Sequence, residues 1–296
     1  MEHITGMGAR KSKFEEPPLS FKSWRTINWK EKQRALEYVN NYTTSIEGLQ
    51  IRILLYGPSG AGKSSFINSV QSVLHGRMFA HALAANVHSG CFTKKYTTYK
   101  IQKEGPDNFY PFVFNDIMGL SPQGGVLVDD IKLALMGHVK EGYRFNPESK
   151  LSEDDPYYVR SPTDNDKVHV LVCVIPAGSL PVMPPGTLQK IRDVRGAASE
   201  LGIPQVVILT KIGEAYPEIK EDLKSVYRVT SFKNMMEKFS AEVGIPLNCI
   251  FPVKNYYEEI DLNNDADSLI LSALKNIINF GQDCFNFRMS HIECLD

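Results

Sequence analysis

The most constraining feature of this chain is an eight-residue phosphate-binding motif, Gly57-Pro58-Ser59-Gly60-Ala61-Gly62-Lys63-Ser64. An apolar run over residues 51–56 precedes the motif, and apolar residues at helical spacing follow it over residues 65–74. A strand, a glycine-rich turn and a helix in this order point backbone N–H groups and a helix N-terminus at a phosphate. The alternative is a glycine-rich turn that binds nothing, and the flanking strand and helix disfavour it. The sequence therefore predicts a phosphate-binding domain.

Each residue type in the motif has a role in holding a nucleotide. Glycines let the backbone turn its N–H groups inward around the phosphates. Lys63 is expected to reach the β- and γ-phosphates as a catalytic residue, and the Ser64 hydroxyl is expected to ligate Mg²⁺. The predicted nucleotide-binding residues of this segment are Gly57, Ser59, Gly60, Ala61, Gly62, Lys63, Ser64 and Ser65.

Strand and helix patterns alternate from Ile51 onward. This alternation predicts an α/β fold, a doubly wound and mostly parallel sheet flanked by helices, in the P-loop NTPase or G-domain architecture. Strands are expected at 51–56, 97–102, 109–115, 168–175, 205–210 and 248–253, the second and third flanking a turn suited to an antiparallel hairpin. Helices are expected at 30–42, 65–74, 126–139, 187–201 and 267–280, with two more between 219 and 243. The expected N-cap of the last helix is Asp265 or Asp267.

The chain divides into a central domain with extensions at both ends. The expected segments are a flexible tail at 1–22, a helical extension packed on the domain at 23–48, the G domain at 49–283 with a surface insertion at 140–166, and a C-terminal tail at 284–296. The helix at 30–42 is amphipathic, which favours docking on the domain over a free partner-binding helix.

Composition narrows the class of partner. The net charge of −1 provides no electrostatic reason to bind nucleic acid or an anionic membrane. No apolar stretch approaches the roughly eighteen residues of a membrane-spanning helix, so no integral membrane segment is expected. The five cysteines include no C-x-x-C pair and fit a reducing compartment, which indicates a cytoplasmic protein. The expected macromolecular partners are either other proteins or a second copy of this chain.

Two further pieces of a nucleotide site follow the phosphate loop. The first is Asp116-Ile117-Met118-Gly119 at the end of an expected strand, where the carboxylate can hold Mg²⁺ through water and the Gly119 N–H can meet the γ-phosphate. The second is a switch threonine, for which Thr93 is favoured as a metal ligand and catalytic residue. Thr97 and Thr98 stay open as alternatives, although they fall where a strand should begin.

The base-recognition motif is incomplete. A G domain has [N/T]-K-x-D after its fifth strand, and here Thr210 and Lys211 are in place while Gly213 occupies the carboxylate position. Losing a hydrogen-bonding group from a specificity site can cost on the order of 10⁴-fold in discrimination, so guanine selectivity stays open. Glu214 stands one residue late. A second base-contacting loop is expected at Val253, Lys254 and Asn255, whose backbone N–H groups can meet the guanine O6.

Catalytic power is expected to be low. The residue after Gly119 orients the attacking water when it is glutamine, but here it is Leu120, whose apolar side chain cannot position water. Hydrolysis of GTP is therefore expected to be slow or to depend on a partner, and whether the protein is an enzyme stays open.

The run of motifs resembles the interferon-induced protein 44 family, especially its short, fish-type members. The resembling stretches are 54–58 through 68–70, 112–120, 142–147 and 251–256, within a similarity that runs from Trp24 to Phe280. The resemblance implies an intracellular GTP-binding G domain induced in antiviral innate immunity, without the additional N-terminal domain of longer members. It carries phosphate and Mg²⁺ roles onto Lys63, Ser64, Asp116 and Gly119, whereas the guanine carboxylate of the family falls on Gly213.

Three hypotheses follow from these residues. The leading one is a Mg²⁺-dependent switch that binds GTP/GDP and acts through protein partners. The second is a pseudo-GTPase scaffold with weak or relaxed nucleotide binding, which Gly213 and Leu120 favour. The third is an ATPase or nucleotide kinase, since these share the phosphate loop. A transporter-type ATPase would also need an L-S-G-G-Q signature and a strand ending in Asp-Glu, and the sequence has neither.

Overall fold

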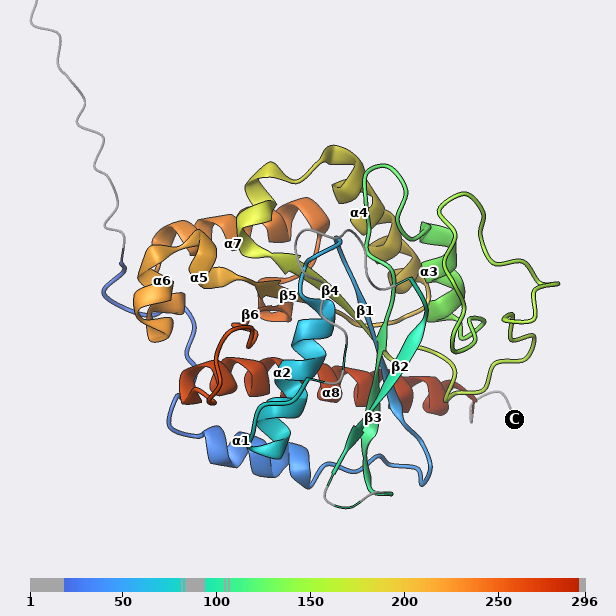
Figure 1. Ribbon diagram of the computed structural model, residues 1–296, viewed down its shortest axis with the longest axis horizontal. Helices are drawn as coiled ribbons and strands as arrows, with labels where there is room; N and C mark the ends of the chain where they lie inside the picture. The colour runs from blue at the N-terminus through green and yellow to red at the C-terminus, as the bar shows by residue number, and fades with distance from the viewer. Residues whose placement is uncertain (1–18, 81, 83–93, 104, 106, 293–296) are drawn as a thin grey trace, which may run out of the picture.

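The computed structural model describes residues 19–80, 82, 94–103, 105 and 107–292, and a six-stranded sheet runs through their centre (Figure 1). Its strands are β1 (Ile51–Tyr56), β2 (Thr97–Gln102), β3 (Phe109–Asp116), β4 (Val170–Pro176), β5 (Gln205–Thr210) and β6 (Ile250–Pro252), in the spatial order β2-β3-β1-β4-β5-β6. The edge strand β2 is antiparallel to β3, and every other neighbouring pair is parallel. The predicted mostly parallel sheet and its hairpin are therefore confirmed.

Helices cover both faces of the sheet (Figure 1). They are α1 (Lys32–Asn40), α2 (Lys63–His75), α3 (Val128–Leu135), α4 (Pro185–Glu200), α5 (Ile212–Ala215), α6 (Pro217–Glu221), α7 (Thr230–Val243) and α8 (Asn264–Ile292), with 3₁₀ turns η1 (Ala177–Val182), η2 (Leu223–Tyr227) and η3 (Leu247–Cys249). Between 219 and 243, where two helices were expected, the chain forms the end of α6, the turn η2 and then α7.

The strand β4 shows why the sheet is buried on both sides. Its side chains are apolar and largely β-branched, a composition that suits a central strand. Alternate residues point to opposite faces, so Leu171 belongs to the apolar cluster that includes buried residues of α3, α4 and α7, while Val172 belongs to the cluster that includes buried residues of α1, α2 and α8. Because β1, β3, β4, β5 and β6 run parallel, their carboxyl ends lie along one edge of the sheet, where loops can build a site.

The last helix differs from its expected bounds. Asn263 is the N-cap, because its Oδ1 accepts the backbone N–H groups of Asp265 and Ala266, each at 3.0 Å. The predicted cap at Asp265 or Asp267 is therefore wrong, and Asp267 instead lies buried inside the first turn. At its other end the helix continues past 280, since Phe285 is buried against the sheet. A single amphipathic pattern of buried residues thus extends the helix to Ile292.

The N-terminal segment packs against the edge of the sheet and against α8. The Arg25 guanidinium lies 5.0 Å from the Trp24 ring, 5.3 Å from the Tyr227 ring and 5.9 Å from the Phe251 ring, and it donates to Ile250 O at 2.6 Å. Tyr38 of α1 donates to Asn279 of α8 at 2.5 Å. The hydrogen bond from Arg25 to Ile250 O engages the backbone of β6, an edge strand.

The segment 140–166 contains only isolated bridges and turns, yet it contributes to the core. Tyr143, Phe145 and Leu151 are buried beside α3. The buried Asp130 carboxylate of α3 accepts the Leu151 N–H at 2.8 Å, which fixes the segment to the domain. Within the described part of the chain, no helix combines the length and the apolar character that crossing a lipid bilayer requires.

Candidate functional site

The phosphate loop lies between β1 and α2, and its backbone requires glycine at two positions. A Cβ on Gly57, where φ is 140°, would lie 2.1 Å from Val174 O, and a Cβ on Gly62, where φ is 94°, would lie 2.9 Å from Asn255 Nδ2. Residues 59–65 line a cavity of about 580 Å³, which extends from the loop toward α5, α6 and the segment 254–265. The backbone thus leaves a space of nucleotide size above the loop.

Two side chains of the motif meet the end of β3. Lys63 Nζ lies across the loop and donates to Gly57 O at 3.3 Å and Pro58 O at 3.2 Å. Ser64 Oγ donates to Asp116 Oδ2 at 2.5 Å, although the two residues are 52 positions apart in the chain. The parallel pairing of β1 with β3 brings the serine and the carboxylate to the same edge of the sheet.

The Ser64 hydroxyl and the Asp116 carboxylate form a donor set that fits Mg²⁺. This ion prefers oxygen ligands, keeps several waters and is commonly bound through one or two side chains plus phosphate oxygens. Among the described residues no group of three or more His, Cys, Asp or Glu side chains could hold a metal without such help. The residues present therefore suit a metal that arrives with a phosphate ligand.

The chain after Asp116 is hydrogen-bonded to the phosphate loop. Leu120 N donates to Gly57 O at 2.9 Å, and Ser59 N donates to Leu120 O at 3.2 Å. A Cβ on Gly119 would lie 2.6 Å from Ser59 Cα, so only glycine permits this approach. The Leu120 side chain is 2% exposed and belongs to the core, which directs it away from the cavity. Lys190 of α4 donates to Ser121 O at 2.7 Å and thereby holds the following turn.

The loops after β5 and β6, where the sequence predicted base recognition, build one end of the cavity, which we call the base-side end. Thr210 Oγ1 donates to Ala61 O at 2.6 Å, and Asn255 Nδ2 donates to Gly62 O at 3.0 Å, so both loops are bonded to the phosphate loop. Gly213 and Glu214 both line the cavity. A Cβ on Gly213 would lie 3.3 Å from Lys220 Cα, a close contact that a small shift of the neighbouring backbone would have to relieve.

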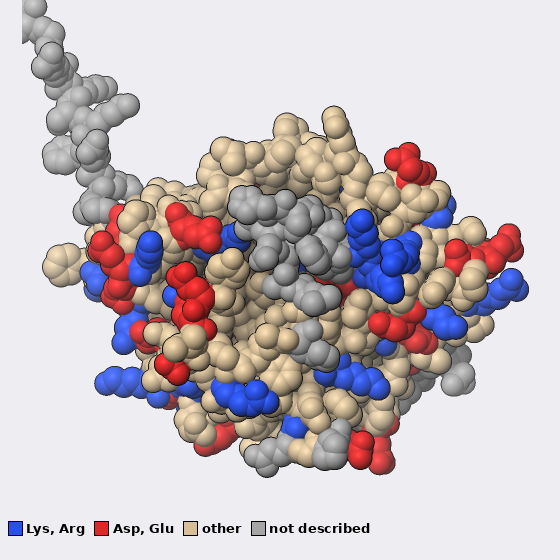
Figure 2. Space-filling view, viewed as in Figure 1, with Lys and Arg blue, Asp and Glu red and all other residues tan. Residues whose placement is uncertain are grey.

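Acidic side chains are concentrated at this end of the cavity. Figure 2 shows them gathered on the left of the face, where Figure 1 places α5 and α6. The carboxylates that line the cavity are Glu214, Glu221, Asp222, Glu258, Glu259 and Asp265.

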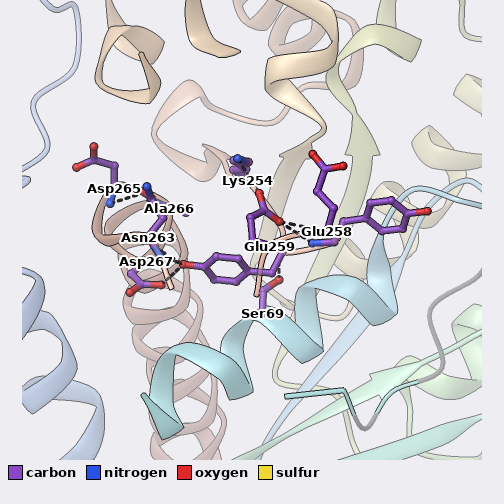
Figure 3. Close-up of polar contacts among 10 residues, drawn as sticks. Ser69, Lys254, Glu258, Glu259, Asn263, Asp265, Ala266 and Asp267 are labelled. Atoms are coloured by element: carbon purple, nitrogen blue, oxygen red, sulfur yellow. Dashed lines mark hydrogen bonds and ion pairs between the residues drawn. The ribbon is translucent and has the colours of Figure 1, made fainter. Parts of the chain in front are cut away.

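Glu259 is the most strongly held of these carboxylates. Its Oε1 lies 2.8 Å from Lys254 Nζ, and its Oε2 accepts Tyr257 N at 3.0 Å (Figure 3). Partial burial alone would raise the pKa of Glu259, but the hydrogen bonds from Lys254 and the backbone outweigh it and lower the pKa to about 2. The carboxylate is therefore ionised at neutral pH and ties the 254–259 loop together.

Comparison with known proteins is informative at the level of sequence. No family model matches the chain. Interferon-induced protein 44 from Pan troglodytes and from Homo sapiens are each 35% identical over 230 residues, which is 77% of this chain and 52% of the relative. The Mus musculus protein is 34% identical over 229 residues, 77% of this chain and 54% of its own length. The chain belongs to the interferon-induced protein 44 family. It spans about half the length of the curated relatives it matches.

The solved structures provide a weaker likeness. Two crystal structures of Toc33 from Arabidopsis thaliana are each 12% identical and cover 86% of this chain and 93% of their own. The structure of a dimerisation-deficient mutant has a TM-score of 0.49, and the complex with GDP and Mg²⁺ has a TM-score of 0.45. A likeness of this size is too low to carry a functional inference.

In this family member the structure brings together most of the residues that sequence motifs had singled out. Residues 59–65, Gly119, Lys211, Lys254 and Asn255 line the cavity. Val253 is fully buried, and its N–H donates to Leu209 O at 2.8 Å, so this N–H is engaged within the fold. Thr93 lies outside the described residues. Thr97 and Thr98 belong to β2, where Thr98 Oγ1 accepts Asn115 Nδ2 at 2.8 Å.

Sequence reasoning missed the wall formed by Tyr256, Asp222 and Asp265, all of which line the cavity. No nucleotide-binding motif marks these residues, because they come from a loop, the start of a 3₁₀ turn and the start of a helix that only the fold brings together. The one available signal was the density of carboxylates between 258 and 267, which also occurs on ordinary solvated surfaces.

Proposed function

We propose that this family member binds a guanine nucleotide, GTP or GDP, together with Mg²⁺ at the phosphate loop. The observation that carries the proposal is the 2.5 Å contact between Ser64 Oγ and Asp116 Oδ2, beside Lys63 on the wall of a cavity of about 580 Å³. A hydroxyl, a carboxylate and an ammonium group around a ring of backbone N–H groups match the chemistry of a metal-bound polyphosphate.

Each residue has a distinct task in this proposal. The N–H groups of Gly60 and of residues 62–65 bind phosphate oxygens, since Ser59 N and Ala61 N donate to Leu120 O and Pro58 O. Lys63 exchanges its carbonyl partners for the β- and γ-phosphates. Ser64, Asp116 and Thr93 would hold Mg²⁺, which would neutralise negative charge on the phosphates. Thr210 supports the loop through Ala61, and Lys211 with Lys254 and Asn255 surrounds the base.

Hydrolysis of GTP is proposed to be slow or dependent on a partner. Leu120 occupies the position that would orient an attacking water, and its side chain is buried in the core. An apolar and buried side chain offers no hydrogen bond to water. A partner or a second copy of the chain would have to supply that polar group.

The cellular role is proposed from the names of the relatives. Because the matched proteins are named as interferon-induced, we propose that this chain acts in an interferon-induced antiviral response, in the cytoplasm and through protein partners or self-association.

A second candidate function is a pseudo-GTPase scaffold that binds nucleotide weakly or with relaxed base choice. Gly213 favours it, because glycine supplies no carboxylate to accept the guanine N1–H and amino group. In this case the surface of the G domain, rather than the bound nucleotide, would determine activity.

Calorimetric titration separates the two candidates. The nucleotide-stripped protein is titrated with GTP, GDP and ATP, each with and without Mg²⁺, and Lys63→Ala serves as the loss-of-site control. Micromolar or tighter GTP binding that exceeds ATP binding by about tenfold, and that Lys63→Ala abolishes, supports the guanine-nucleotide proposal. Equal binding of GTP and ATP supports relaxed base choice. Binding that survives Lys63→Ala, or no binding of any nucleotide, contradicts a nucleotide site at this loop.

A further inference from the structure

A chain of polar contacts joins the N-terminal segment to the wall of the cavity. Tyr256 lines the cavity, and its phenol donates to Asp267 Oδ1 at 2.6 Å and accepts Asn263 N at 2.7 Å. Asp267 is fully buried in the first turn of α8, and its Oδ2 lies 2.5 Å from Nζ of Lys32, the first residue of α1. Figure 3 shows Asp267 and Asn263 facing the same phenol.

The cation is essential to this arrangement. A fully buried carboxylate is stable as an anion only when it is paired and hydrogen-bonded, and Lys32 is its ion-pair partner. Lys32 Nζ also donates to Asn264 Oδ1 at 2.9 Å, which fixes the ammonium group against α8. Without the cation, the buried carboxylate loses its ion-pair partner, and the Asp267 side chain that accepts the Tyr256 hydrogen bond is no longer held in place.

The loop that carries Tyr256 has three anchors. Asn255 Nδ2 donates to Gly62 O, and Tyr256 N donates to Ser69 Oγ at 2.9 Å, so two anchors lead to the phosphate loop and α2. The third anchor is the Tyr256 phenol, and it leads away from the phosphates to Asp267 and Lys32. A movement of α1 can therefore displace Tyr256 and the adjoining wall of the cavity, which we call the base-side wall, while the phosphate loop keeps its own contacts.

We propose that Tyr256 is a positioning residue for the base-side wall, and that the Lys32–Asp267 ion pair, rather than the other contacts of α1, supports affinity for the nucleoside part of the ligand. The inference rests on the proposed nucleotide site and deepens it, since it names the segment of the chain that regulates the site. The ion pair with Lys32 of α1 holds Asp267, Asp267 accepts the hydrogen bond of the Tyr256 phenol, and the phenol fixes the loop that borders the base.

The test compares a ligand with a base and one without. GDP with Mg²⁺ and inorganic tripolyphosphate with Mg²⁺ are titrated calorimetrically into the wild-type full chain and into Tyr256→Phe, Lys32→Ala, Lys32→Arg and Tyr38→Phe. The last variant is the matched control, because it removes the 2.5 Å bond between Tyr38 and Asn279 that also joins α1 to α8. Circular dichroism and thermal melting verify that each variant is folded. Tyr256→Phe keeps the packed aromatic ring, so this variant still tests the inference if Lys32→Ala fails to fold.

The expected result is selective for the base. Tyr256→Phe and Lys32→Ala weaken GDP binding about fivefold to tenfold, the size of the net contribution of one typical hydrogen bond, and leave tripolyphosphate affinity within about twofold of wild type. Lys32→Arg keeps most of the GDP affinity, and Tyr38→Phe keeps all of it.

Three results would overturn the inference. They are equal losses for GDP and tripolyphosphate, an equal GDP loss in Tyr38→Phe, and wild-type GDP affinity in both Tyr256→Phe and Lys32→Ala. A wild-type protein that binds neither probe contradicts the proposed function, and with it this inference. Wild-type binding of GDP that none of the variants changes contradicts the inference alone.

Discussion

Thr210 Oγ1 donates a 2.6 Å hydrogen bond to the carbonyl oxygen of Ala61, a residue 149 positions earlier in the chain. Both residues are fully buried. The bond joins the carboxyl end of β5 to the phosphate loop. The strand that leads into the loop at Lys211 and Gly213 therefore also supports the phosphate loop. Thr210, which the sequence predicted to contact the ligand, is thus bonded to the backbone of the phosphate loop and is not among the residues that line the cavity.

Replacing Thr210 with Val removes this hydroxyl and keeps the shape of the side chain. The free energy of unfolding should fall by about 1–2 kcal/mol, because a buried hydrogen bond is lost and the Ala61 carbonyl loses a partner. Tripolyphosphate affinity should weaken severalfold as the loop loosens, and Thr210→Ser should retain both properties. Urea denaturation and calorimetry measure the two effects, and a Thr210→Val protein as stable as wild type would show that the bond contributes nothing.

Asp116→Asn tests the metal ligand. The amide has the size of the carboxylate but no charge, so the variant should lose the Mg²⁺ dependence of GDP binding. We expect GDP affinity of the variant to be the same in Mg²⁺ and in EDTA, whereas wild-type affinity should rise about tenfold or more with Mg²⁺. Asp129→Asn is the control, since Asp129 is an exposed residue of α3 that pairs with Lys132 and Lys150. A Mg²⁺ effect that survives in Asp116→Asn would place the ion elsewhere.

Gly213→Asp restores the carboxylate that the base motif lacks. The backbone permits a side chain there, although the new Cβ would meet Lys220 Cα at 3.3 Å and require a small shift. The ratio of GTP to ATP affinity should increase by about tenfold or more, because the carboxylate can accept two guanine hydrogen bonds. Gly213→Ala measures the cost of the Cβ alone. An unchanged ratio in Gly213→Asp would mean that the base does not lie at this loop.

His169 should make folding sensitive to mild acid. Burial, with Arg288 and Arg52 nearby, lowers the pKa of His169 from 6.5 to about 3, and its Nδ1 accepts Arg52 N at 3.0 Å. Below about pH 6.5 the unfolded chain binds a proton that the folded chain does not accept until about pH 3. The free energy of unfolding should therefore decrease as the pH falls across this window, by up to about 1.4 kcal/mol per pH unit.

The measurement is urea denaturation at pH 7.5, 6.5 and 5.5, compared with His169→Asn. Asparagine can accept the Arg52 N–H but does not titrate, so its stability should vary less over this range. The lowered pKa of Glu259 acts only below the ordinary value of 4.5 and does not overlap the pH range measured. Identical pH profiles for both proteins would show that His169 is not the titrating group.

Local patterns were sufficient for the framework of the fold. The run of residues 51–56, the glycines that follow and the apolar spacing after Ser64 predicted β1, the phosphate loop and α2, because strand period, turn chemistry and helix period are properties of adjacent residues. The same holds for β2 and β5, which have the expected bounds. The position of Asp116 beside Ser64 also followed, since parallel strands end at one edge of the sheet.

The amino-acid sequence by itself therefore determined the fold class, the family and the glycine-rich loop between β1 and α2, all of which depend on short-range patterns. Tertiary structure alone decided the base-side wall, where Tyr256, Asp267 and Lys32 meet although α1 and α8 lie near opposite ends of the chain. It also decided the cap of α8, because Asp267 is buried by its ion pair and Asn263 bonds the helix N-terminus in its place. Burial and ion pairing between distant residues depend on the whole packed chain, and no local pattern encodes them.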